Sequence, residues 1–311
     1  MKTSVHRGIL TSELVATVGD GLVALAASLR ASGARELLFA DVTGGGGDHT
    51  EAWLRFFADV PAVRVLTSDQ DPLALGRLRE RFATELSGGR LELARARFSE
   101  ATHLWGERLV LGWVADLGFS SDQLDHADRG LSFRSEGPLD MRLDQERLEM
   151  TAADWLAQAS ETEIADTLYE LGGERFSKRI AHLIVSERAR GRAPKTTTEL
   201  SAMVVRATPS AARHGRLHVA TRTFQALRIR INRELEELDS LLASGMMKLV
   251  SGGRAGIMTF HSLEDRRVKQ AFKAEGFRPV TKKPIRPGRE EARSNPRSRS
   301  AKLRVVERNL A

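Results

Sequence analysis

A run of four glycines, Gly44–Gly47, separates an apolar segment from a charged, helix-like one, and Asp48 and His49 follow it directly. Glycine has no side chain to keep a ligand away from the backbone, so such a loop after a strand is typical of a nucleotide or nucleoside site. The motif SDQD then places Asp69 and Asp71 about 20 residues downstream, which is the spacing of the ribose-binding acid in dinucleotide folds. The combination predicts a bound nucleoside.

The residues around the glycines discriminate among three ligands. A phosphate-binding P-loop would end in Gly-Lys-Ser/Thr, but this loop has no lysine. A dinucleotide fingerprint would need a glycine at His49 or Thr50, and Asp48 would repel its pyrophosphate. S-adenosylmethionine is cationic at sulfur and has no phosphate, so it tolerates acidic neighbours. The sequence therefore favours S-adenosylmethionine as the cofactor, with an ordinary glycine-rich turn as the alternative.

The segments that must position these residues alternate between strand-like and helix-like patterns. Strands are predicted at 36–42, 62–69, 90–98 and 108–116, and helices at 49–57 and 72–86. Such alternation predicts a parallel sheet with right-handed crossovers. In open α/β sheets the carboxyl ends of the strands carry the reacting groups, and Asp116 ends the fourth strand. Asp116 is therefore a candidate catalytic residue, with a turn or helix-cap role as the alternative.

The alternation breaks in the middle of the chain. Residues 121–147 are polar and loop-like, and residues 151–208 hold four amphipathic segments with turn signals between them, for which Thr151 and Thr197 are expected N-caps. The core pattern then resumes, with a long helix at 219–248, a strand at 252–260, a helix at 262–274 and a strand at 301–307. The simplest architecture is an α/β domain interrupted by a helical insertion.

Composition narrows the class of protein. The chain has 311 residues, 41% hydrophobic and 29% charged, which is typical of a soluble globular protein. We expect a cytoplasmic protein without membrane contact, because the N-terminus lacks a signal-peptide core and no apolar run approaches the roughly 20 residues of a membrane span. The absence of cysteine excludes disulfides, cysteine–zinc sites and thiolate nucleophiles.

The excess positive charge is local. The whole chain carries +7, but residues 278–304 contain ten Lys or Arg and only two acids, a local net charge of +8. A segment of this kind indicates a polyanionic partner, for which RNA or DNA is favoured over a membrane surface. The alternative is a solvated tail.

The stretch ADLGFSSDQLDHADRGLSFRSEGPLDMR (115–142) closely resembles the RsmH (MraW) family of bacterial methyltransferases, which modify the exocyclic N4 of a cytidine in the decoding region of 16S ribosomal RNA. Other segments resemble the family in order along the chain: DVTGGGGDH, SDQDP, GERFSKRIA, HVATRTFQALRIRINRELEEL, FHSLEDRRVK and NPRSRSAKLRVVER. The resemblance covers nearly the whole chain. It implies a class I (Rossmann-like) methyltransferase sheet with an inserted all-helical domain. The core would then comprise 1–120 and 218–311, and the substrate-recognition domain 121–217.

The same resemblance implies the partner and, together with the motifs above, the cofactor contacts. The partner would be 16S rRNA or the small ribosomal subunit, and a homodimer is left open. Phe98 would lie near the adenine, and Asp116 and Gln123 at the methionine end. The full set of expected cofactor contacts is Gly45, Gly46, Gly47, Asp48, His49, Asp69, Asp71, Phe98, Asp116 and Gln123.

The implied chemistry is displacement at an activated methyl carbon by a poorly nucleophilic amine. A hydrogen-bond acceptor for the N4 hydrogens makes this nitrogen more nucleophilic, and the candidate catalytic residues are Asp116, Ser120 and His261. For His261 the alternative is a structural role at the start of a helix, where Ser262 reads as the N-cap and Asp265 as its capping-box partner. Methylation at carbon 5 would need a cysteine. No metal is expected.

Reaching N4 requires a base out of its stack, so aromatic and basic residues of the family motifs are candidate substrate contacts. Phe119 and Phe133 are candidates to pack on the base, with loop anchoring as the alternative for Phe133. Candidates for phosphates or for the target base, each with a structural ion pair as its alternative, are Arg134, Arg142, Arg222 and Arg228.

The chain departs from the family pattern at several positions. It has Gly8 and Asp122 where proline is usual, Asp48 where glycine is usual, and Gly44 where a bulkier residue is usual. These departures leave room for a non-catalytic RNA-binding or ribosome-assembly factor that retains the fold. A dinucleotide-dependent oxidoreductase is a further alternative, which the failed glycine fingerprint and the cationic segment disfavour.

Overall fold

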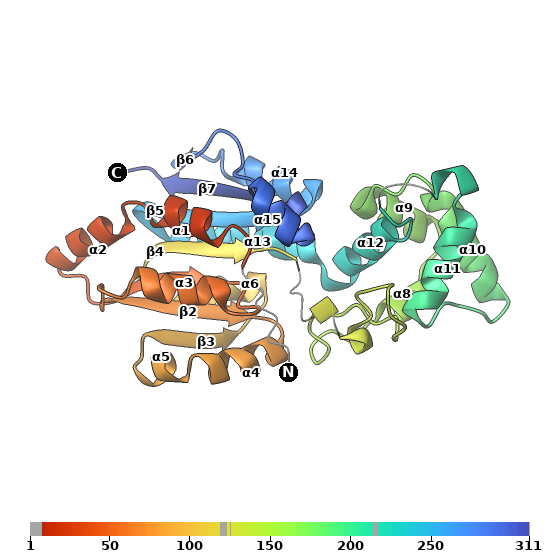
Figure 1. The fold of residues 1–311 in the computed structure, drawn as a ribbon, viewed down its shortest axis with the longest axis horizontal. Coiled ribbons are helices and arrows are strands. Elements are labelled where there is room, and N and C mark those ends of the chain that lie inside the picture. Colours follow the sequence, from red (N-terminus) through yellow and green to blue (C-terminus); the bar gives the residue numbers. More distant parts are fainter. Residues whose placement is uncertain (1–7, 119–122, 125, 214–216, 311) are drawn as a thin grey trace. The chain divides into compact units, whose positions relative to one another are not determined.

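The computed structural model describes residues 8–118, 123–124, 126–213 and 217–310. Two compact units make up the chain (Figure 1): a sheet unit, residues 1–119 and 236–311, and a helical unit, residues 120–235. The helical unit is thus a single insertion. The family resemblance implies that the chain returns to the core at residue 218, whereas the compact sheet unit resumes at residue 236, because helix α12 (Thr221–Asn232) packs on helices α8 and α9 of the insertion.

The sheet unit is built on seven strands in the order β3-β2-β1-β4-β5-β7-β6. Neighbours from β3 to β5 are parallel, as expected, but β7 runs antiparallel to both β5 and β6. Hydrophobic periodicity does not record strand direction, so the sequence could not predict this reversal, and it missed the short β6. The strands are β1 Leu37–Asp41, β2 Val63–Asp69, β3 Leu91–Arg95, β4 Leu109–Asp116, β5 Leu249–Thr259, β6 Phe277–Pro279 and β7 Lys302–Arg308.

Helices cover both faces of this sheet, and the interior strand β1 is buried along its whole length. Successive side chains of a strand point to opposite faces. Leu37 and Phe39 accordingly join a core with α1 to α4, while Leu38 and Ala40 join a second core with α13, α14 and the short helix η1. The helices of this unit are α1 Thr11–Gly19, α2 Leu22–Ala31, α3 Asp48–Phe56, α4 Pro72–Arg81, α5 Ala83–Ser87, α6 Phe98–Ala101, η1 Thr102–Trp105, α13 Glu234–Lys248 (shared with the helical unit), α14 Ser262–Ala271, α15 Arg289–Ser294 and η4 Pro296–Ser300.

Helices α1 and α2 were not anticipated from the sequence. Together they form Thr11–Ala31, which among the described residues is the one helical stretch long and apolar enough to cross a membrane by length and composition. This corrects the expectation that no segment approaches that length. In the structure Leu14, Val18 and Leu22 of this stretch lie in the core of the sheet unit, as in an ordinary packed helix.

Two predicted helices are interrupted. The helix expected at 72–86 divides at Phe82 into α4 and α5. The helix expected at 219–248 divides at Arg233, whose backbone is left-handed (φ 53°), into α12 and α13. The Asn232 side chain just before this break donates to the Met141 carbonyl (2.8 Å) and accepts from the Leu143 N–H (2.7 Å). A tertiary contact therefore fixes the chain at the break, and no propensity of the sequence reveals it.

The helical unit packs α9 between α10 and α12. Side-chain caps begin α8, α9 and α11 at Thr151, Ser160 and Thr196, each with a capping box. Thr151 was predicted, but the cap of α11 is Thr196 rather than Thr197, whose hydroxyl instead donates to the Ser135 carbonyl. The helices are α8 Ala152–Gln158, α9 Glu161–Gly172, α10 Ser177–Ala189, α11 Thr197–Ala207 and α12, with short turns η2 Ala127–Arg129 and η3 Ser210–Ala212.

Candidate cofactor and methyl-transfer site

The candidate site lies where the strand order reverses. The chain runs from β1 outward to β2 and β3, and then crosses back to place β4 on the other side of β1. In open α/β sheets ligands bind outside the carboxyl ends of the strands at such a switch point. Three aspartates end strands at this edge: Asp41 on β1, Asp69 on β2 and Asp116 on β4.

The glycine loop joins β1 to α3 in a tight turn held by backbone hydrogen bonds within the loop and to β2. Gly44 N–H donates to the Ser68 carbonyl (3.0 Å), and Gly47 N–H donates to the Gly44 carbonyl (2.8 Å). A Cβ on Gly47, whose φ is 88°, would stand 2.7 Å from Leu78. A Cβ on Gly46 would meet nothing within 4 Å. The loop is therefore closed against the protein at Gly47 and open at Gly46.

Asp69 ties this loop to β2. Its two carboxylate oxygens accept from the Gly45 N–H (2.8 Å) and the Asp71 N–H (2.9 Å). Burial, the largest influence, raises the pKa of Asp69 despite these hydrogen bonds. Asp71 is 1% exposed and caps α4 by accepting from the Leu73 N–H (3.0 Å). Of the two predicted ribose ligands, Asp69 is the partly exposed one and Asp71 is built into the fold.

Arg81 binds the residues that follow the open glycine. Its guanidinium group forms an ion pair with Asp48 (2.9 Å), donates to the Gly46 carbonyl and pairs with Glu51. The Asp48 charge is thus balanced within the chain. A Cβ on Gly8 would stand 3.1 Å from the Asp48 Cβ, so two of the unusual residues of this chain are in contact. Nothing in the glycine motif itself points to Arg81, which lies more than 30 residues away in the sequence.

A polar network links β1, α3 and β4. His49 Nε2 lies 3.4 Å from Asp116 Oδ2. The Asp116 N–H donates to the Thr43 hydroxyl (2.7 Å), which in turn donates to Asp41 (3.3 Å). The Thr50 hydroxyl also donates to Asp41 (2.9 Å). Asp116 Oδ1 is buried and has no hydrogen-bond partner among the described residues.

The buried groups of this network have shifted pKa values. Burial raises the pKa of Asp41 to about 6, and its contacts with His49, Thr43 and Thr50 offset that effect only in part. Burial, the largest influence on His49, favours the neutral imidazole. The Asp116 contact and the charges of Asp41 and Asp48 outweigh it, so the pKa of His49 is raised. His49 was predicted as a cofactor contact, whereas Asp41 was missed, although a strand ending in Asp just before the glycines is a usable signal.

The other two catalytic candidates, His261 and Ser120, are not part of this polar network among the described residues. His261 is itself the N-cap of α14 and forms the capping box with Glu264, whose carboxylate lies 3.1 Å from His261 Nε2. Ser262 is therefore not the cap. Asp265 does not complete the box either, because it pairs with Lys302 and Arg304 of β7. The structure thus gives His261 a structural role. Ser120, like Phe119 and Asp122, lies outside the described residues.

Phe98 and Gln123 fall in different units. Phe98 begins α6, just after β3, and is half-buried against the second core of the sheet unit. Gln123 belongs to the helical unit, where its side chain is buried. The structure therefore brings the loop, Asp69, Phe98 and Asp116 to one edge of one sheet, and Gln123 is described only within its own unit.

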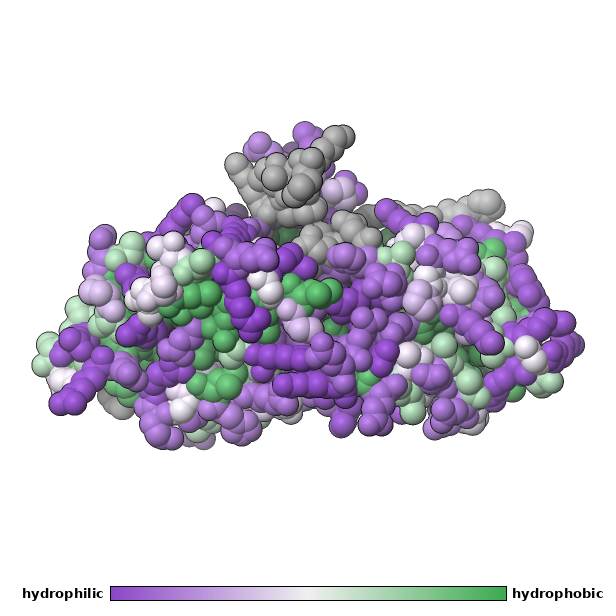
Figure 2. All heavy atoms as spheres, turned by 90° about the horizontal axis from the view of Figure 1, so that it is seen from below, coloured by the Kyte–Doolittle hydropathy of each residue, from purple (hydrophilic) through white to green (hydrophobic). Residues whose placement is uncertain are grey.

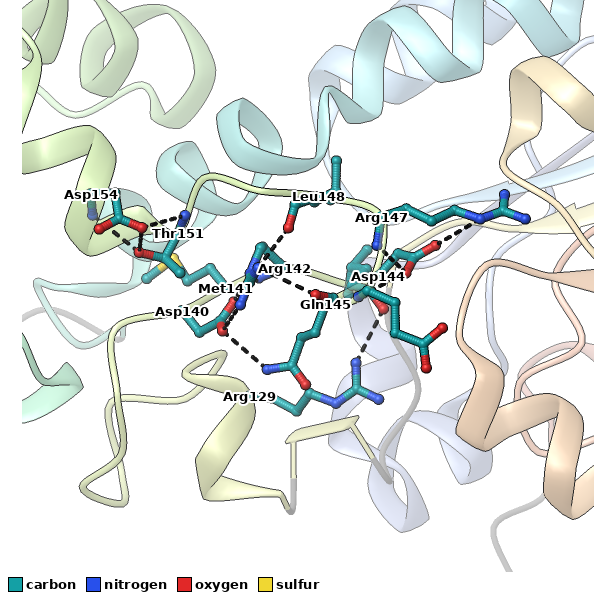
Figure 3. A network of polar contacts seen from close by, with 12 residues as sticks. Arg129, Asp140, Met141, Arg142, Asp144, Gln145, Arg147, Leu148, Thr151 and Asp154 are labelled. Carbon is teal, nitrogen blue, oxygen red and sulfur yellow. Dashed lines mark hydrogen bonds and ion pairs between the residues drawn. The ribbon is translucent and has the colours of Figure 1, made fainter.

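Two of the predicted substrate arginines have structural partners. Arg142 forms a bidentate contact with Asp140 (2.7 Å) and donates to the carbonyls of Gln145 and Leu148 (Figure 3). Arg228 pairs with Glu234 through two hydrogen bonds of 2.7 and 2.9 Å. Each supports the fold of the helical unit, the alternative considered for them. Arg134 and Arg222 are exposed.

The basic segment 278–304 is partly neutralised by the rest of the sheet unit. Arg278 pairs with Glu307, and Lys302 and Arg304 pair with Asp265. Among the described residues, exposed basic side chains of this segment without an ion pair are Lys282, Lys283, Arg286, Arg289, Arg293 and Arg299. The basic segment 278–304 therefore remains strongly cationic. Hydrophilic side chains also predominate on the face of the molecule that Figure 2 shows.

The donor set of the edge fits one of the three ligands considered. It offers carboxylates and an open glycine and, as in the loop sequence, no lysine, which suits a cationic sulfonium with hydroxyls better than a pyrophosphate. The open space at Gly46 leaves room for such a ligand beside the backbone. The sheet order, with β7 reversed, is that of a class I (Rossmann-like) methyltransferase sheet, and the donor set at its edge agrees with that class.

Comparison with known proteins agrees with this class. The profile of the MraW methylase family matches residues 3–309. Ribosomal RNA small subunit methyltransferase H of Synechococcus sp. (strain JA-2-3B'a(2-13)) is 48% identical over 282 residues, which cover 88% of this chain and 86% of that protein. The protein of the same name from Bradyrhizobium diazoefficiens is 43% identical over 299 residues, with 88% and 86% covered. The chain belongs to the MraW methylase family, and its cofactor is S-adenosyl-L-methionine, as predicted.

Proposed function

We propose that the protein methylates the exocyclic N4 of a cytidine in the decoding region of 16S rRNA. The observation that carries the proposal is Asp116, a carboxylate at the end of β4 with one buried oxygen unused among the described residues. The names of the relatives, ribosomal RNA small subunit methyltransferase H, support rRNA as the substrate. The sequence motifs support cytidine N4 as the acceptor.

Asp116 would accept a hydrogen bond from the N4 amino group through Oδ1. This contact withdraws the nitrogen lone pair from the ring and aligns the amine for an in-line displacement. His49 Nε2 lies 3.4 Å from Asp116 Oδ2, and its raised pKa would add positive charge beside the carboxylate. After transfer, Asp116 is placed to take the proton that the nitrogen loses.

The remaining residues of the edge would hold the cofactor, which supplies the activated methyl group when bound. Asp69 retains lone pairs beyond its two backbone contacts, so it can accept from the ribose hydroxyls. The open side of Gly46 admits the nucleoside close to the backbone. Phe98, half-buried after β3, would pack on the adenine.

The partner would be the small ribosomal subunit, which places the activity in the cytoplasm. The exposed lysines and arginines of 278–304 would attract RNA in a salt-dependent way. Such attraction supplies affinity without selecting a base.

The test is methyl transfer to small ribosomal subunits that lack modifications in the decoding region, followed by fragment mapping of the labelled RNA. We expect label in the decoding-region fragment with the wild type. Asp116→Asn keeps the shape but loses the acceptor charge, so it should abolish the label while cofactor binding persists. Asp59→Asn, at an exposed aspartate of the same unit, is the matched control and should retain activity. Label confined to another fragment would exclude the decoding region as the target.

A further inference from the structure

Three aromatic rings form a ladder in the helical unit. The His218 ring stacks on Phe133 with centroids 4.7 Å apart and an interplanar angle of 22°. Phe133 meets Phe224 of α12 edge-on at 5.2 Å. Phe224 is 5% exposed, Phe133 is half-buried and His218 is exposed. The ladder therefore runs from the core to the surface and ends in an exposed aromatic ring.

Local contacts fix the outer ring before any ligand binds. His218 Nδ1 accepts a hydrogen bond from the Ala220 N–H (3.2 Å), which sets the orientation of the imidazole. The loop that carries Phe133 is held from α11, because the Thr197 hydroxyl donates to the Ser135 carbonyl (2.8 Å) and accepts from the Gly137 N–H (3.2 Å). The stack is therefore preorganised rather than a contact of two mobile side chains.

Two exposed cations lie close to the stacked residues in the sequence. Arg134 follows Phe133 directly, and Arg222 lies at the start of α12, where it reaches the Gly173 carbonyl at 3.3 Å. One acid, Glu136, lies on the same loop. An exposed ring backed by a second ring and accompanied by arginines is the arrangement by which proteins bind unpaired bases.

We propose that His218, backed by Phe133, is a stacking platform for one unpaired base of single-stranded RNA, with Arg134 and Arg222 as contacts for the adjoining phosphates. This proposal rests on the proposed function for its choice of RNA as the ligand. It changes the role predicted for Phe133, which supports the platform from below, while His218 offers the surface. Phe224 anchors the assembly to α12.

The experiment uses the full-length protein and a short single-stranded RNA of decoding-region sequence containing 2-aminopurine, whose fluorescence falls when the base stacks. We expect quenching with the wild type. His218→Ala should abolish the quenching and weaken binding roughly tenfold or more, whereas His218→Phe should preserve both, because base stacking needs only a flat ring. Arg222→Gln should weaken binding and reduce its dependence on salt.

Several controls separate the outcomes. His182→Ala removes an exposed histidine of the same unit outside the ladder and should bind like the wild type. S-adenosylmethionine binding and the thermal midpoint establish that each variant is folded. Wild-type affinity and quenching in His218→Ala, or loss of both in His218→Phe with the fold intact, would overturn the platform. A wild type that binds and quenches but transfers no methyl group would overturn the proposed function and leave the platform standing.

Discussion

The last two glycines of the loop, Gly46 and Gly47, should respond differently to substitution by alanine. Gly47 has φ 88° and faces Leu78 and Phe82, both buried, whereas Gly46 faces open space. Alanine at Gly47 should therefore strain the loop backbone and lower the stability of the fold. Alanine at Gly46 should leave the fold intact and occupy space that we assign to the cofactor.

The magnitudes follow from the geometry. A left-handed backbone costs a non-glycine residue about 1–2 kcal/mol. The new methyl group would also stand 2.7 Å from Leu78 and 2.8 Å from Phe82, and overpacking of this kind costs about 1–3 kcal/mol. Gly47→Ala should therefore lower the free energy of unfolding by about 2–5 kcal/mol. Gly46→Ala should change it by less than about 0.5 kcal/mol, as at an unconstrained surface position.

Urea unfolding measures the stability of both variants, and isothermal titration calorimetry measures S-adenosylmethionine affinity. We expect Gly46→Ala to unfold like the wild type but bind the cofactor at least tenfold more weakly. Equal unfolding midpoints for the two variants would refute the loop geometry. Wild-type cofactor affinity in Gly46→Ala would refute the assignment of the open space to the cofactor.

Three further substitutions probe other contacts. Because burial raises the pKa of Asp41 from 3.8 to about 6, the folded state holds this proton more tightly. The contribution of Asp41 to stability should therefore fall by up to about 3 kcal/mol as pH rises through that window, and the difference between the wild type and Asp41→Asn in urea unfolding should change by this amount over the same range. Arg81→Met should cost about 1 kcal/mol in thermal unfolding and weaken cofactor binding, whereas Arg55→Met, at an exposed partner of the same Glu51, should do neither. Asn232→Leu removes the hydrogen-bond partners of the Met141 carbonyl and the Leu143 N–H, and it should lower the free energy of unfolding in urea by about 2–4 kcal/mol. A decrease below about 0.5 kcal/mol would contradict the stabilising role of these hydrogen bonds.

The strands at the site could be predicted because they are buried and continuous. Each of the expected strands at 36–42, 62–69 and 108–116 exists within a residue or two of its predicted bounds. The positions of Asp69 and Asp116 could also be predicted, because each is the last residue of a strand that the hydrophobic pattern predicts. The parallel alignment of β1, β2 and β4 then brings these ends to one edge.

Long-range partners could not be predicted in the same way. Arg81 balances Asp48, and Glu264 rather than Asp265 faces His261, because backbone geometry places these side chains within reach. The break at Arg233 depends on loop backbone about 90 residues earlier in the chain. A single sequence records propensity and period, whereas these contacts depend on how distant segments meet.

The chemical identity of the product tests the central claim most directly. The purified protein is incubated with methyl-labelled S-adenosylmethionine and unmodified small ribosomal subunits, and the RNA is digested to nucleosides for mass spectrometry. We expect the label in N4-methylcytidine. Label in 5-methylcytidine or in another nucleoside, or the absence of transfer by a protein that binds both cofactor and subunit, would contradict the assignment of Asp116 and its edge of the sheet to cytidine N4 methylation.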